Sequence, residues 1–175
     1  EDFAFYEKIG VPAPRWCPLC RLQRVMLWRN ERNLYRRKEA LSGREIVSIY
    51  GPEKPFAVYS PKDWWGDAWN PLDHGRDYDF SKPFFVQFRE LMERVPLVAL
   101  FTINGVNSDY CNHAEDSKNC YFLFEGIWNE NVCYSKIMAH CRDSLDVYSA
   151  DKSELVYESI NANECYRVSF SKNVT

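Results

Sequence analysis

The sequence lacks long hydrophobic runs and a secretory signal. No stretch approaches the roughly 18 consecutive apolar residues that cross a bilayer, and residues 1–6 have neither a basic start nor an apolar core. The seven cysteines are odd in number and scattered, unlike the framework of a disulfide-rich secreted protein. We therefore expect a cytoplasmic protein without a membrane partner, whose cysteines are thiols or metal ligands.

The sequence also lacks the common catalytic motifs, including a phosphate-binding loop, a nucleophile elbow and HExxH. The segment 63–79 looks most catalytic, because Asp67, Asp73, His74 and Asp77 accompany three tryptophans. Carboxylates among aromatic rings suit glycosidic cleavage or cation binding, but aspartate is also a routine turn residue. The balance leans against an enzyme, and a carbohydrate-binding or carbohydrate-active β-helix protein remains an alternative.

Acidic residues are scarce between residues 15 and 44. This segment holds nine lysines and arginines against Glu31 and Glu39, a formal charge of +7, whereas the whole chain carries −3. Such a separation creates a positive local field that favours an anionic partner.

A helical pattern begins at Cys17-Pro18-Leu19-Cys20 and predicts a helix from about residue 18 to about residue 41. Pro18 suits the first turn of this helix, and Gly43 suits its C-terminal stop. Residues 45–50 and 56–60 are interpreted as the two strands of a hairpin.

A second helix is expected over residues 82–94, capped by Ser81. A buried strand is expected over residues 97–104. The buried face of the second helix should carry Phe84, Phe88, Leu91, Met92 and Val95.

The remaining sequence repeats a small or apolar residue before a tyrosine. The tyrosines are Tyr110, Tyr121, Tyr134, Tyr148, Tyr157 and Tyr166, with spacings of 11, 13, 14, 9 and 9 residues. Short strands at such intervals predict stacked rungs of a β-solenoid, although an antiparallel meander would give similar spacings. The expected fold class is α+β, with a zinc-knuckle, helix and hairpin unit over 1–96 and a parallel β-helix-like solenoid over 97–175.

One face of the first predicted helix combines arginines with aromatic rings. At 100° per residue this face carries Arg21, Arg24, Trp28, Arg32, Tyr35 and Arg36. Arginine forks bind phosphates and flat rings stack on bases, so we expect this face to bind nucleic acid, with RNA favoured. The alternatives are docking against the chain's own acidic remainder, plain solvation, and a protein-interaction scaffold built on an acidic solenoid.

Cys17 and Cys20 form half of a zinc site, because two thiolates at a helix start need two further ligands. Two unliganded core cysteines are the alternative interpretation. Cys111 and His113 have a chelating spacing and are weaker candidates for completing the site.

Three stretches together resemble a known family. They are DFAFYEKIGVPAPRWCPLCRLQRVMLWRNERNLYRRK (2–38), SIYGPEKPFAVYSPKDWWGDAWNPLDHGRDYDFSKPFFVQFRELM (48–92) and NSDYCNHAEDSKNCYF (107–122). The chain is similar over nearly its whole length to zinc-ribbon (CPxC) proteins with a Cys/Tyr repeat from candidate-phylum bacteria. That family has no established activity, so the resemblance bears on architecture.

The resemblance implies that Cys17 and Cys20 are the second cysteine pair of a zinc site whose first pair lies upstream. It also implies a second site that lacks all four thiols, because its positions hold Glu39, Ser42, Ser60 and Asp63. We therefore expect the second site to be metal-free and its hairpin to be held by packing alone.

Overall fold

The computed structural model describes residues 2–27 and 29–175. The chain divides into two compact units, Glu1–Asn30 and Glu31–Thr175. The domain boundary expected near residue 96 falls inside the second unit. None of the described helices is both long and apolar enough to span a bilayer.

The first unit holds two helices, α1 (Asp2–Lys8) and α2 (Pro18–Met26). Pro18 occupies the first turn of α2, where the missing N–H costs nothing. The helix expected to run to residue 41 ends at Met26. Beyond it, residues 35–38 form an extended strand instead, because they find backbone partners in residues 45–48.

The second unit begins with short elements. They are β1 (Tyr35–Lys38), β2 (Glu45–Ser48), β3 (Val58–Tyr59), α3 (Pro61–Trp64), a 3-10 helix η1 (Pro71–His74), α4 (Phe84–Arg94) and β4 (Leu97–Val98). The expected hairpin of residues 45–50 and 56–60 is wrong. Strand β2 pairs antiparallel with β1, whereas β3 pairs parallel with β4.

Helix α4 lies where a helix was expected, but with a different start and a different buried residue. Pro83, and not Ser81, occupies the N-cap position of α4, and no side chain caps this end of the helix with a hydrogen bond. Phe84 and Phe88 remain 54% and 40% exposed, and Gln87 is the buried residue of this helix. The side-chain amide of Gln87 accepts the backbone N–H of Asp79 and donates to its carbonyl. These hydrogen bonds, and not buried phenylalanine side chains, fix α4 to the preceding loop.

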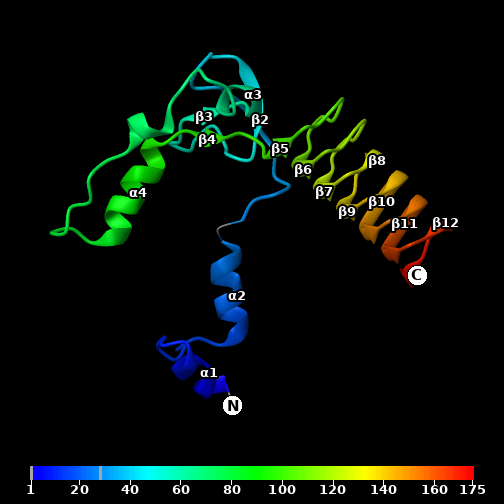
Figure 1. The fold of residues 1–175 in the computed structure, drawn as a ribbon, viewed down its shortest axis with the longest axis horizontal. Coiled ribbons are helices and arrows are strands. Elements are labelled where there is room, and N and C mark those ends of the chain that lie inside the picture. Colours follow the sequence, from blue (N-terminus) through cyan, green and yellow to red (C-terminus); the bar gives the residue numbers. More distant parts are fainter. Residues whose placement is uncertain (1, 28) are drawn as a thin grey trace. The chain divides into compact units, whose positions relative to one another are not determined.

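The rest of the second unit is a parallel β-solenoid of about six turns over residues 102–174. Its strands stack along one axis in Figure 1. They are β5 (Thr102–Ile103), β6 (Asn112–Glu115), β7 (Phe124–Ile127), β8 (Glu130–Cys133), β9 (Lys136–Ala139), β10 (Arg142–Asp151), β11 (Glu154–Asn163), β12 (Tyr166–Ser169) and β13 (Lys172–Val174). All their pairings are parallel, which excludes the antiparallel meander.

The coils of the solenoid all have the same length. Asn112 pairs with Phe124, Phe124 with Lys136, and Lys136 with Tyr148, always 12 positions apart. From Asn104 to Asn173, every third residue has a positive φ between 42° and 66°. A coil therefore has four left-handed corners, a conformation that costs most residues about 1 kcal/mol.

The residue that follows each corner points inward, which gives the core a period of three. Every third residue from Cys111 to Cys165 is buried, and most of these are Ser, Cys, Ala or Val. Small side chains are needed because each side of a coil is short. Stacking buries these ladders between neighbouring coils, as expected for a solenoid.

Inward serines and cysteines also bond the backbone. Ser144 Oγ donates to the carbonyl of Arg142 and accepts from Val156 N–H in the next coil. Cys120 donates from Sγ to the carbonyl of Lys118 and interacts with the backbone N–H of Val132. Serine and cysteine thus perform the same task, and the buried cysteines are structural.

Candidate functional site

Cys17 caps the start of α2 and brings the two CxxC thiols together. Its Sγ accepts the backbone N–H of Cys20 at 3.4 Å. That hydrogen bond lowers the pKa of Cys17, while the hydrogen bond with Cys17 raises the pKa of Cys20. Cys17 therefore loses its proton more readily than Cys20, and both thiols are exposed.

The two thiols border an apolar hollow of about 450 Å³ on α2, lined also by Trp16, Gln23, Arg24 and Leu27. Thiolates at a helix start match half of a tetrahedral zinc site. Within residues 2–27 and 29–175, no three or more His, Cys, Asp or Glu side chains gather as a metal-binding group. The described chain thus offers two zinc ligands at this position.

Two arginines of α2 lie against aromatic rings. Arg21 donates to the hydroxyl of Tyr6 at 2.6 Å, and its guanidinium lies 6.0 Å from the centre of that ring. The guanidinium of Arg24 lies 5.4 Å from the centre of the Trp16 ring, which is 56% exposed. A guanidinium that lies over a ring, as Arg24 does, keeps its donors directed outward for an anion, whereas Arg21 uses one of its donors on the Tyr6 hydroxyl.

The other residues of the expected basic face are not on α2. Trp28 lies outside the described residues. The guanidinium of Arg32 covers Phe124 at 5.6 Å, and Tyr35 and Arg36 belong to β1. The expectation of one continuous helical face is therefore wrong, because the helix ends before these positions.

Several basic residues of the second unit contact its own acceptors. Arg36 pairs with Glu45 at 3.0 Å on the surface. Arg37 donates to the carbonyls of Gly51 and Phe56 at 3.3 and 2.8 Å, which ties β1 to the loop between β2 and β3. Part of the +7 segment is thus used for folding.

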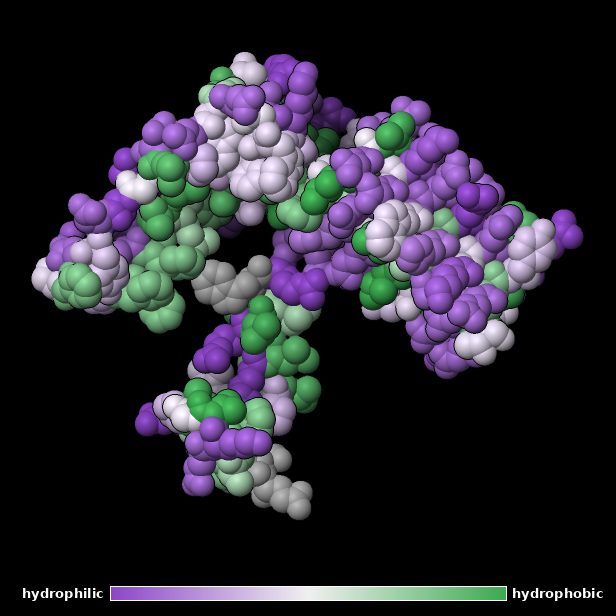
Figure 2. Space-filling model, in the orientation of Figure 1, coloured by the Kyte–Doolittle hydropathy of each residue, from purple (hydrophilic) through white to green (hydrophobic). Residues whose placement is uncertain are grey.

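The hydrophobic residues of α2 do not pack into a core. None of its residues is buried, and Leu19 and the following Leu27 are 77% and 79% exposed. Figure 2 shows hydrophobic side chains along this helix.

The four residues that the resemblance assigned to a second, metal-free site, Glu39, Ser42, Ser60 and Asp63, lie around the buried carboxylate of Glu39. Glu39 accepts hydrogen bonds from Ser42 Oγ, from Arg44 Nη2 at 3.3 Å and from Ser60 N–H at 2.5 Å. Arg44 also pairs with Asp63 at 2.7 Å, and Ser60 Oγ accepts Asp63 N–H. The expectation that packing alone holds this region is wrong, because a hydrogen-bonded ion pair links the two turns.

The weaker metal candidates point in opposite directions. Cys111 is buried in the solenoid, whereas His113 is exposed and lies against Phe101 with ring centres 5.7 Å apart. Cys141 is also buried, and its neighbour His140 stacks outside on Trp128. The inward and outward positions of the coil thus separate Cys111 from His113, so these two side chains do not face a common metal ion.

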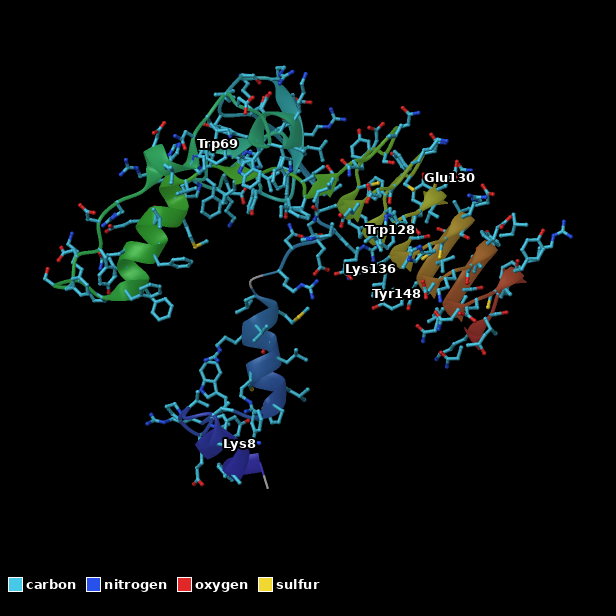
Figure 3. The ribbon with its side chains drawn as sticks, in the orientation of Figure 1. Lys8, Trp69, Trp128, Glu130, Lys136 and Tyr148 are labelled. Atoms are coloured by element: carbon cyan, nitrogen blue, oxygen red, sulfur yellow. The ribbon has the colours of Figure 1, made fainter. Side chains whose placement is uncertain are left out.

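The tryptophans of the segment 63–79 serve the fold of this segment. Trp64 Nε1 donates to the carbonyl of Pro96 at 3.3 Å, and Trp69 Nε1 donates to the carbonyl of Trp64 at 2.8 Å. Trp69, labelled in Figure 3, also meets His74 edge-on. Asp67, Asp73 and Asp77 are exposed, so the arrangement gives no buried catalytic carboxylate pair.

The solenoid also carries a groove that the sequence interpretation missed. It lies beside Trp128 and His140, which occupy the same corner of successive coils. Equivalent positions of successive coils lie 12 residues apart, and this constant spacing could have revealed the groove. The irregular spacing of the tyrosines obscured it.

Comparison with known proteins gives no relative: no family model matches the chain, and neither does any curated protein or solved structure.

Proposed function

We propose that the protein is a nucleic-acid-binding module, with RNA as the favoured ligand, and that the contact surface lies on α2. The carrying observation is the pair of arginine and ring contacts, Arg21 on Tyr6 and Arg24 on Trp16, one helical turn apart. Guanidinium groups bind phosphates as forks, and an exposed indole can stack on a base. The surface is smaller than the six residues expected from the sequence.

Cys17 and Cys20 belong to the same proposal as two ligands of a zinc ion. A bound zinc would tie the start of α2 to whatever supplies the remaining ligands and would stabilise the fold around the arginines. Mass spectrometry of the purified protein should find zinc, and C17S/C20S should lose it. Absence of zinc in protein purified without chelators contradicts this part alone.

Salt dependence tests the nucleic-acid surface. If Arg21 and Arg24 each neutralise one phosphate, log affinity for single-stranded RNA should fall against log salt with a slope of about −1.4. R21Q/R24Q should bind several-fold more weakly at low salt, whereas R21K/R24K should recover only part, because lysine lacks the fork.

R89Q/R94Q is a matched control, because it removes the same charge from helix α4. It should bind like the wild type. The proposal fails if the wild type does not bind mixed RNA or DNA oligonucleotides at about 20 mM salt, where screening is weak. It also fails if the control loses as much affinity as R21Q/R24Q.

A further inference from the structure

A groove of about 480 Å³ runs across successive coils of the solenoid. Its two walls are columns of outward side chains, and each column gains one member per coil. One wall contains Asp116, Trp128, His140 and Lys152, and the other contains Lys118, Glu130, Arg142 and Glu154. The volume is in the range of sites that hold small molecules.

The first wall carries a pair of stacked aromatic rings between Asp116 and Lys152. The ring centres of Trp128 and His140 are 4.7 Å apart and their planes are tilted by 32°. Both residues sit at left-handed corners, with φ of 53°, so their side chains project from the edge of the coil. His140 covers one face of the Trp128 ring, but Trp128 is still 52% exposed, which leaves the rest of its ring available to a ligand.

The second wall is charged but balanced. Lys118 and Arg142 both pair with Glu130, at 3.2 and 3.4 Å. Over the whole lining, the acids Asp116, Glu130 and Glu154 match the bases Lys118, Arg142 and Lys152 in number. The groove therefore has no net charge to attract a polyanion or a free cation, while it offers donors and acceptors side by side.

We propose that this groove binds a neutral glycan. The apolar face of a pyranose ring packs against the part of the Trp128 ring that His140 leaves uncovered, and its hydroxyl groups form hydrogen bonds with the carboxylate of Glu130 and the guanidinium of Arg142. Hydroxyls both donate and accept, so they suit a wall of alternating charges better than a phosphate or an ammonium does. The site is separate from the nucleic-acid surface proposed on α2.

The test uses the full chain and titration calorimetry with neutral oligosaccharides, namely hexamers of β-1,4-glucose, β-1,3-glucose, β-1,4-mannose and β-1,4-N-acetylglucosamine. We expect at least one to bind, and W128N to bind it about tenfold more weakly, a loss of about 1.4 kcal/mol. Asparagine is chosen because it tolerates a left-handed corner. E130Q, which keeps the shape of the wall, should weaken the same ligand.

Y148N is the matched control. Tyr148 is 48% exposed on the same solenoid but does not line the groove. Trp128 and Tyr148 are both labelled in Figure 3. Y148N should bind like the wild type, and circular dichroism should show that all variants remain folded. The proposal is overturned if none of the four hexamers binds the wild type at millimolar concentration, or if W128N and Y148N bind equally.

Discussion

The carboxylate of Glu39 accepts the backbone N–H of Ser60 at 2.5 Å, across 21 residues of sequence. Glu39 is only 2% exposed, and with Arg44 and Asp63 it joins the turn after β1 to the start of α3. A buried carboxylate therefore does the cross-linking here, and its loss should be costly.

We expect E39Q to lower the free energy of unfolding by roughly 1–3 kcal/mol at pH 7, because buried donors lose an ionic acceptor. Urea denaturation followed by tryptophan fluorescence measures this change. E45Q is the control, because Glu45 belongs to an exposed pair with Arg36 and should cost less than about 1 kcal/mol. Equal losses in both variants would contradict the role of Glu39.

The same carboxylate predicts a pH dependence. Burial raises the pKa of Glu39, but hydrogen bonds from Ser42 and Ser60 outweigh it and lower the pKa from 4.5 to about 2. A depressed folded-state pKa stabilises the fold above the unfolded value and loses this effect as the pH falls. The wild type should thus lose stability between about pH 4.5 and pH 2, and E39Q should show a flatter profile in the same window.

Inward serines should tolerate cysteine better than alanine. Ser144 is 3% exposed and bonds both its own coil and the next one. S144A leaves a buried N–H and a buried carbonyl without this partner and should cost roughly 1–3 kcal/mol. S144C should cost less, because Cys120 performs this task elsewhere in the solenoid. Thermal unfolding of both variants compares them, and the reverse order would refute the equivalence.

Removing a β-branched residue from a left-handed corner should stabilise the solenoid. Ile137 has a φ of 59° and is 39% exposed, so its side chain adds strain with little burial. I137N should raise the free energy of unfolding by about 1 kcal/mol, because asparagine visits this conformation readily. I160N is the control, since Ile160 is 44% exposed and is not at a positive-φ corner. A gain in I160N but not in I137N would contradict the argument.

The cysteines should differ in reactivity. Burial raises the pKa of Cys111 to about 11, whereas Cys17 is exposed and its pKa is lowered by the hydrogen bond from Cys20. Iodoacetamide at pH 8 should therefore label Cys17 well before Cys111, because the thiolate is the nucleophile. Peptide mass spectrometry over time reads the order, and added zinc should slow the labelling of Cys17 if it binds there.

The solenoid was predictable from the sequence, but its period was not. Tyrosines fall on several outward columns, with Tyr110 and Tyr134 at corners and Tyr121 and Tyr148 beside them. Their spacing therefore varies, because solvent does not fix the position of an exposed ring. The inward Ser, Cys, Ala and Val positions repeat without a slip, because core space is fixed by the coil.

The extent of the first helix was not predictable from its periodicity. The pattern of arginines continues past Met26 onto β1, where the pairing of Tyr35 with Ser48 decides the conformation. Such a contact depends on a partner from a separate strand, which a helical wheel cannot include. The same limit hid the ion pair of Glu39, since its partners come from two separate turns.

The uniform 12-residue coil limits how the solenoid, residues 102–174, can change in length during evolution. Gain or loss of one full repeat adds or removes a whole layer and leaves all other layers as they were. Insertion of a single residue instead breaks the alternation of corners and inward positions within one coil, so the extra residue must loop outward for the following serines and valines to keep their place. Homologues of the solenoid should therefore differ in length by whole layers and rarely by a fraction of one.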